Sequence, residues 1–156
     1  MTERRSVLPA SGAGGDLPDV NVWLALAIEE HPHHRAASAY WDRDARTPKY
    51  FCRVSAMSLV RLLTHPKLMG DKPLSLSKSW ALYRSFASLP GVSMLAEPEG
   101  LDKELGQLVT ARLPARLFTD AYFASVAKKA ALRLVTFDKD FERFEQLVAL
   151  CLPTGD

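Results

Sequence analysis

The sequence predicts a three-layer α/β/α fold, in which helices cover both faces of a mainly parallel sheet of four to five strands. Short apolar segments alternate with longer segments of helical periodicity along most of the 156 residues, as in strand–helix–strand units. The segment Arg133–Phe137 has an apolar centre, which is typical of a strand buried on both faces. Hydrophobic residues make up 47% of the chain and charged residues 24%, so it has enough apolar material for a core and is not globally disordered.

The first sixteen residues differ from the rest of the chain. They are rich in Gly, Ser and Ala and show neither helical nor strand periodicity. We therefore expect a flexible N-terminal tail over residues 1–16 and one folded domain over residues 17–156.

The first half of the folded part alternates between the two kinds of segment. A short strand over 17–20 leads into an apolar helix over 22–28, and Pro32 separates this helix from a second one over 33–44. A short strand follows over 49–53. Ser55 is the expected N-cap of the next helix, which ends at His65-Pro66 because the residue before a proline disfavours helical backbone.

The second half repeats this alternation. A helix over 77–89 ends at Pro90-Gly91, and a strand over 92–95 and a helix over 101–113 follow. Thr119 is the expected N-cap of a helix that runs to Leu132 and carries Asp120 in its first turn. The chain closes with a strand over 133–137, a helical turn over 138–144 and a strand over 147–152.

Composition and charge exclude some classes of protein but do not identify a function. The net charge of +2 permits nucleic-acid binding without arguing for it, since strongly basic binders are far more lopsided. The chain has no apolar run near the ~20 residues that a membrane helix needs, so we expect no membrane partner. Cys52 and Cys151 lie in apolar runs without a CxxC spacing, which favours free thiols and a cytoplasmic location.

Three aspartates are expected to meet at one edge of the sheet. Asp19 lies near the end of the first strand and Asp138 directly after the strand that holds Thr136, while Asp120 begins a helix. Ligands of open α/β sheets bind beyond the carboxyl ends of the strands. Each aspartate alone is explained by a helix cap, a helix dipole or a turn. Their convergence on one edge is what points to a function.

Clustered carboxylates favour a hard divalent cation. Their mutual repulsion raises their pKa values and destabilises the fold unless a cation neutralises it. Mg²⁺ prefers oxygen ligands and retains several waters, which suits a few carboxylates that face a phosphate. Such an ion activates a water molecule and stabilises a leaving oxygen. The pattern therefore predicts hydrolysis of phosphate esters without a serine, cysteine or histidine nucleophile.

Four segments in this order resemble the PIN-domain ribonucleases, in particular the VapC toxins of bacterial toxin–antitoxin pairs. They are Leu17–Leu26, Phe51–Pro66, Thr119–Ala124 and Leu134–Phe141, and the likeness extends from about residue 17 to the end of the chain. The resemblance implies a PIN fold, Mg²⁺ or Mn²⁺ as cofactor, cleavage of RNA, a homodimer, and inhibition by a small antitoxin protein.

The resemblance also implies roles for individual residues. Asp19, Asp120 and Asp138 would be catalytic and bind the metal together with Asp140. Two neighbours would support them: Asn21 would orient Asp19 or the substrate, and Thr136 would take a similar part.

One position departs from the family pattern. Where the family's middle helix carries a glutamate, this chain has Ala56, so the site is one carboxylate short. The alternative function is therefore a catalytically weakened PIN-fold module that binds RNA or protein. A second alternative is an aspartyl-phosphate phosphatase, which expects a second aspartate where Asn21 stands.

The sequence leaves two further features open. The spacing of His31, His33 and His34 is compatible with a transition-metal site or with a solvated loop before a helix. A basic bias also surrounds the acidic positions, which suits either RNA phosphates or an ordinary solvated surface; its residues are Arg53, Arg61, Lys67, Lys72, Lys78, Arg84, Arg116, Lys128 and Lys129.

Overall fold

Five parallel strands form the sheet in the computed structural model, which describes residues 14–70 and 72–154. The strands are β1 (Asp16–Pro18), β2 (Lys49–Phe51), β3 (Val92–Met94), β4 (Arg133–Thr136) and β5 (Ala149–Cys151). Their order in the sheet is β3-β2-β1-β4-β5, and every neighbouring pair is parallel. The predicted α/β class and parallel sheet are confirmed.

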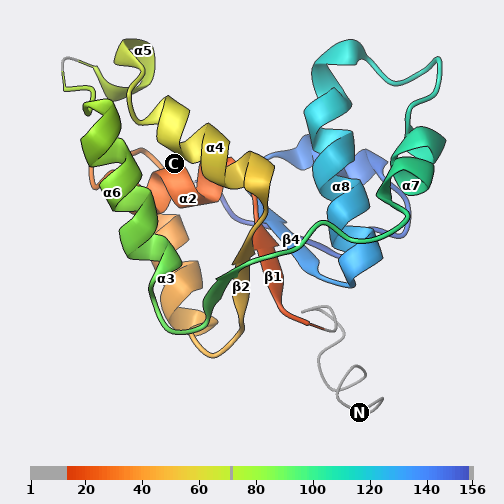
Figure 1. Cartoon of the computed structure of the whole chain (residues 1–156), viewed down its shortest axis with the longest axis horizontal. Helices are drawn as coiled ribbons and strands as arrows, with labels where there is room; N and C mark the ends of the chain where they lie inside the picture. Colours follow the sequence, from red (N-terminus) through yellow and green to blue (C-terminus); the bar gives the residue numbers. More distant parts are fainter. Residues whose placement is uncertain (1–13, 71, 155–156) are drawn as a thin grey trace.

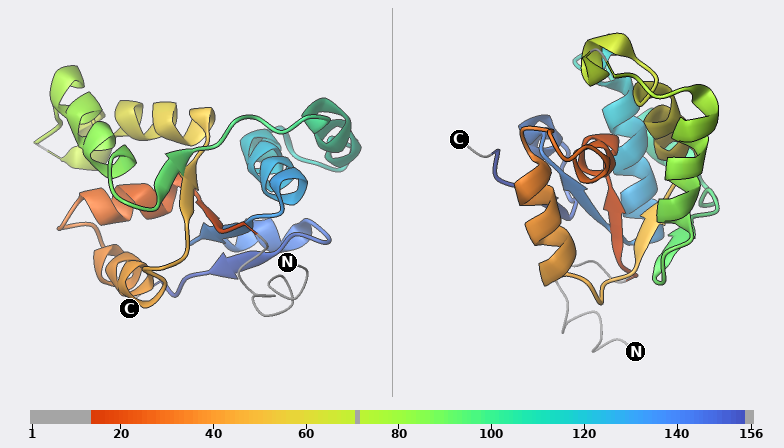
Figure 2. Two further views of the ribbon diagram at one scale, coloured as in Figure 1. Left: turned by 60° about the horizontal axis from the view of Figure 1, so that its bottom comes forward. Right: turned by 90° about the vertical axis from the view of Figure 1, so that its left-hand side faces the viewer.

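Helices cover both faces of this sheet (Figures 1 and 2). On one face lie α7 (Leu101–Leu108) and α8 (Phe118–Ala130), which pack side by side. The opposite face carries α2 (Val20–Ala27) and α3 (His34–Arg43). α4 (Arg53–Leu62) and α6 (Leu76–Ala87) extend this second layer, and the short α5 (Pro66–Met69) connects them.

Strand β4 shows why two helical layers are needed. Leu134 packs against the α8 face, whereas the next residue, Val135, packs against α2 and α3 on the other face. Successive side chains of a strand point to opposite faces, and all four residues of β4 are buried. The apolar run seen in the sequence therefore marks the centre of the sheet.

Trp23 anchors α2 to the rest of the second layer. Its ring is fully buried and stacks on Phe51 of β2, with the ring centroids 3.9 Å apart. Trp41 and Phe86 meet its edges from α3 and α6. Because Asp19 is the N-cap of α2, this packing also helps to fix the position of its carboxylate.

The expected boundary at residue 16 lies too late, because Asp16 is the first residue of β1 and is fully buried. Its carboxylate accepts two hydrogen bonds from Arg133 at 2.9 Å each and one from Tyr40 at 2.6 Å. Arg133 also donates to Asp44 at 3.1 Å. We call Asp16, Tyr40, Asp44 and Arg133 the amino-edge network. The rest of the expected tail, residues 1–13, lies outside the described residues.

Two expected helix caps are wrong. Helix α4 begins two residues before Ser55, at Arg53, and the Ser55 hydroxyl instead accepts from the N–H of the N-cap residue Cys52 at 3.0 Å. Helix α8 begins at Phe118 rather than after Thr119, because the 3₁₀ turn η2 (Ala115–Leu117) runs directly into it. Asp120 nevertheless lies in the first turn, as predicted.

The structure also bears on the cysteines and on membrane segments. Both Cys52 and Cys151 are free thiols, as expected. Among residues 14–70 and 72–154, no helix has both the length and the apolar character that a bilayer crossing requires.

Candidate metal centre

Asp19 lies directly after β1 and serves as the N-cap of α2. One carboxylate oxygen accepts from the N–H of Val20 at 2.7 Å, and the other accepts from the Thr136 hydroxyl at 2.9 Å. The residue is 6% exposed. Burial raises the pKa of Asp19 from 3.8 to about 6, although both hydrogen bonds favour the charged form.

Asp138 and Asp140 follow β4, which lies next to β1 in the sheet. The Thr136 hydroxyl accepts from the N–H of Asp138 at 3.0 Å, so this one side chain links Asp19 to Asp138. Asp138 then caps the 3₁₀ helix η3 (Lys139–Arg143) by accepting from the N–H of Asp140 at 2.8 Å. These bonds fix the carboxylate of Asp138 and the backbone of Asp140 at the carboxyl edge of the sheet.

Asp120 reaches the same edge from the first turn of α8. Its carboxylate lies with those of Asp138 and Asp140, and the three groups have oxygens within 4.8 Å of one another. Burial, together with the charges of the other three aspartates, raises the pKa of Asp120 to about 6, against a lowering by Arg116. The structure thus brings together Asp19, Asp120, Asp138 and Asp140, which we call the aspartate cluster.

The cluster fits a divalent cation. Several carboxylates held close together repel one another, and a cation that prefers oxygen ligands removes this electrostatic cost. In addition, the buried Oδ1 of Asn21 has no hydrogen-bond partner within the described part of the chain. A buried acceptor without a partner destabilises the fold, and Asn21 lies two residues after Asp19. A hydrogen bond from Asn21 to Asp19 is not found among these residues.

Comparisons with known proteins identify the family. Residues 17–147 match the profile of the PIN domain. The chain belongs to the PIN domain family. It is 37% identical over 134 residues to a protein of Mycobacterium tuberculosis named Ribonuclease VapC41, covering 82% of this chain and 92% of that protein. Ribonuclease VapC33 of the same organism is 29% identical over 134 residues, covering 84% of this chain and 93% of that protein.

Solved structures agree on the fold of this PIN domain. VapBC2 from Rickettsia felis, solved with a DNA fragment of its promoter, superposes with a TM-score of 0.66 at 13% identity and covers 88% of this chain and 98% of that one. The M. tuberculosis toxin VapC20, which cleaves the sarcin–ricin loop, gives a TM-score of 0.64 at 18% identity, with coverages of 88% and 99%. At these identities the likeness shows the PIN fold alone.

The histidines of this PIN domain have structural roles instead of forming a metal site. The imidazole Nδ1 of His31 accepts from the N–H of His33 at 3.0 Å, and Nδ1 of His34 donates to the carbonyl of Ala25 at 2.7 Å. The ring of His33 stacks on Phe137. Within the described ranges, the one group of His, Cys, Asp and Glu side chains close enough to hold a metal is made of aspartates.

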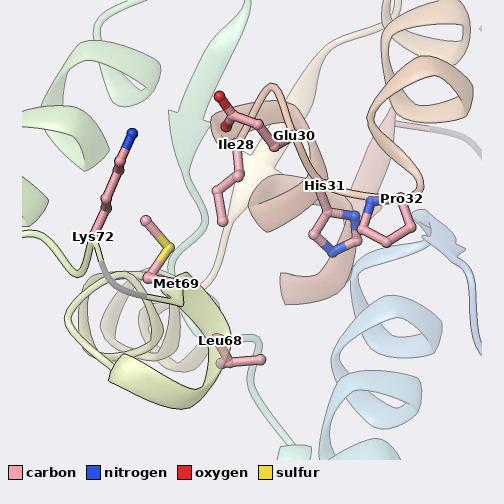
Figure 3. Close-up of a pocket in the computed structure, with 7 residues that line it drawn as sticks. All are labelled: Ile28, Glu30, His31, Pro32, Leu68, Met69 and Lys72. Atoms are coloured by element: carbon pink, nitrogen blue, oxygen red, sulfur yellow. The ribbon is translucent and has the colours of Figure 1, made fainter.

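A pocket beside these histidines is separate from the aspartate cluster. Figure 3 shows side chains of the α2–α3 turn, including His31, facing Leu68 and Met69 of α5. None of the four aspartates lines it. This pocket is therefore not the metal centre.

Ala56, the position at which the resemblance leads us to expect a glutamate, lies in α4. Its methyl group is 2% exposed and packs in the apolar cluster around Trp23. The missing carboxylate is thus replaced by core packing, and the aspartate cluster stands without it.

Replacing Thr136 with valine should weaken metal binding about 10–100-fold, the usual effect of losing a group that orients metal ligands. The hydroxyl holds both Asp19 and Asp138, and valine keeps the shape without the hydrogen bonds. Calorimetric titration with Mn²⁺ measures the change. Thr136→Ser, which keeps the hydroxyl, is the matched control and should bind almost normally; equal losses in both variants would contradict the assigned role.

The pKa values of Asp19 and Asp120 predict a pH-dependent effect of metal on stability. Both pKa values lie above the ordinary value of 3.8, so without metal the folded chain binds more protons than the unfolded chain between pH ~4 and ~6. The free energy of unfolding therefore falls as pH rises through that window. A cation binds the ionised form and opposes this loss. Mg²⁺ should therefore raise the melting temperature more at pH about 7.5 than at pH about 5, as calorimetry can measure; equal shifts would contradict it.

Proposed function

We propose that this PIN domain is a metal-dependent endoribonuclease that acts as the toxin of a type II toxin–antitoxin pair. The observation that carries the proposal is the meeting of Asp120, Asp138 and Asp140, with oxygens within 4.8 Å, next to Asp19 at the carboxyl edge of the sheet. The names of the VapC relatives support ribonuclease as the chemistry.

The four aspartates would together bind Mg²⁺ or Mn²⁺. Asp19, Asp120 and Asp138 are the catalytic set and Asp140 is a fourth ligand. When bound, the ion supplies a polarised phosphate oxygen and an activated water. Thr136 holds the carboxylate of Asp19 and the backbone N–H of Asp138, and Asn21 supplies an acceptor that has no partner among the described residues.

Arg116 completes the rim of this site. It lies 3.4 Å from Asp140, and its side chain is 70% exposed, so it is free to turn toward an incoming phosphate. A guanidinium suits the planar, bidentate recognition of phosphate oxygens. It would hold the RNA backbone against the repulsion of the aspartate cluster.

The alternative functions are less favoured. A module without catalytic power would not need four aspartates converging at a cost in stability, and the matched relatives are named ribonucleases. The phosphatase expects a second aspartate where Asn21 stands, and the PIN profile spans most of the chain.

Incubation with labelled RNA tests the proposal. The purified chain should cut the RNA with Mg²⁺ or Mn²⁺, stop when a chelator is added, and recover when the metal is restored. RNA binding without cutting under either metal would instead favour the binding module.

The partners follow from the same proposal. The matched structures include a VapBC2 complex and a toxin–antitoxin complex from Klebsiella pneumoniae, which supports a small antitoxin protein as partner. We expect the chain to be cytoplasmic, to form a homodimer, and to lose its activity when the antitoxin binds. Light scattering of the purified chain tests the dimer, and a mass of 17.3 kDa would contradict it.

Restoring the family glutamate should strengthen the centre. We expect Ala56→Glu to raise metal affinity and cleavage rate, because the resemblance places a metal-binding carboxylate at this position. Without metal the variant should melt at a lower temperature, since position 56 is 2% exposed and a carboxylate there is desolvated. Ala56→Gln is the uncharged control. Identical metal titration curves for Ala56→Glu and the unaltered chain would contradict the expectation.

A further inference from the structure

A basic hollow lies along two of the elements that carry the aspartate cluster, α8 and η3. It has a volume of about 530 Å³ and is lined by side chains from three segments: the end of α7 with the loop after it, helix α8, and the end of η3 with the residues that follow. We call it the basic pocket. Its polar lining includes Arg112, Lys128 and Arg143, together with Gln107, Thr110 and Gln146.

Two cations of the basic pocket have no acidic partner among residues 14–70 and 72–154. Lys128 forms an ion pair with Glu104 at 2.8 Å, in which both side chains are 19% exposed. Arg112 and Arg143 are exposed, and neither has a carboxylate oxygen within 4.0 Å in the described part of the chain. Glu145 is the one carboxylate of the lining, so the pocket has an excess of positive charge. Two free guanidinium groups around one hollow are suited to a phosphate.

The loop after α7 holds Arg112 in place. Thr110 Oγ1 accepts from the N–H of Arg112 at 3.3 Å, and the carbonyl of Thr110 accepts from the N–H of Leu113 at 3.0 Å. On the opposite side, Gln146 has a φ of 63°, a left-handed conformation that glycine adopts with less strain. The pocket therefore has an amide side chain at a position where backbone conformation alone would favour glycine.

The basic pocket is joined to the aspartate cluster by two elements. Arg143 lies three residues beyond Asp140 along η3, a rise of ~6 Å. Lys128 lies eight residues beyond Asp120 along α8, a rise of ~12 Å. A polyanion held at the aspartate cluster would have its next phosphates within reach of the basic pocket.

We propose that the basic pocket binds a backbone phosphate of single-stranded RNA next to the phosphate that is cut. The inference rests on the proposed ribonuclease function and adds a subsite to it. RNA is favoured over an acidic peptide because η3 and α8 carry both the metal-binding carboxylates and the cations of the pocket. Substrates long enough to reach the pocket bind better, and a dinucleotide gains nothing from it.

The test compares two double variants of the full chain that remove equal charge. Arg112→Gln with Arg143→Gln alters the pocket, whereas Arg46→Gln with Arg84→Gln removes two exposed arginines in other segments, before β2 and on α6. Cleavage kinetics are measured with a ten-nucleotide RNA and a dinucleotide. The pocket variant should raise KM for the long RNA about tenfold with little change in kcat, and leave the dinucleotide unaffected.

Salt dependence gives an independent readout. Each phosphate that a protein neutralises on a single strand contributes a slope of about −0.7 to the logarithmic salt dependence, so losing the one phosphate of the pocket should make the slope of kcat/KM shallower by about 0.7. Glu145→Gln, which removes the carboxylate of the pocket, should lower KM for the long RNA.

Two outcomes would overturn the inference and leave the ribonuclease standing. One is an equal KM for the two double variants, and the other is an equal loss on both substrates. If the unaltered chain cuts neither RNA with any metal, the proposed function fails first and the subsite falls with it.

Discussion

Replacing Asp120 with asparagine should lower metal-dependent RNA cleavage about a thousandfold. Asparagine keeps the shape of the side chain but removes one of the three charges whose oxygens lie within 4.8 Å. A metal ion contributes several kcal/mol of transition-state stabilisation, and ~4 kcal/mol corresponds to about three orders of magnitude in rate. Single-turnover cleavage of labelled RNA at saturating Mg²⁺ measures the loss.

Asp102→Asn provides the matched control. Asp102 is also an aspartate in the first turn of a helix, but it is exposed on α7 and does not belong to the aspartate cluster. Its replacement should leave the rate almost unchanged. If Asp120→Asn retained most of the activity, or if both variants lost it equally, the cluster would not be the catalytic centre.

The largest effect on stability is expected from Arg133→Met. This change leaves the carboxylate of Asp16 fully buried without its cation, which typically costs about 3–5 kcal/mol. For a chain of this size each kcal/mol shifts the melting temperature by about 2–4 °C, so we expect a fall of about 10 °C. Calorimetry or chemical denaturation measures the change.

Two comparisons isolate the cause of this loss. Asp16→Asn combined with Arg133→Met removes both charges and should be more stable than Arg133→Met alone. Arg116→Met breaks an ion pair whose side chains are 70% and 45% exposed, and it should change stability by less than about 1 kcal/mol. A loss for Arg133→Met as small as that for Arg116→Met would show that the amino-edge network is not a main support of the fold.

The parts of the fold that local patterns specify could be predicted from the sequence. Apolar runs predicted the five strands, and the signal is clearest for β4, which is buried on both faces along its whole length. Asp19 and Asp138 could be placed together because each follows such a strand, and parallel strands end at the same edge. Thr136 could be placed near them for the same reason.

The remaining features depend on residues that are distant in sequence. Asp16 pairs with Arg133, 117 residues away, so no local signal marks it as the start of the fold. The start of α8 was placed too late because η2 leads into the helix without a side-chain cap. The basic pocket draws Arg112 and Arg143 from separate segments, and only the packing of α7 and α8 shows that they share one hollow.

Electron paramagnetic resonance of Mn²⁺ tests the central claim, that the aspartate cluster is a metal centre, most directly. Free Mn²⁺ gives a signal that is lost on binding, so a titration counts the bound ions without relying on activity. We expect the unaltered chain and Asp102→Asn to bind Mn²⁺ alike, and Asp120→Asn and Asp138→Asn to lose that binding. Equal Mn²⁺ binding by all four proteins, or none by the unaltered chain, would contradict the account.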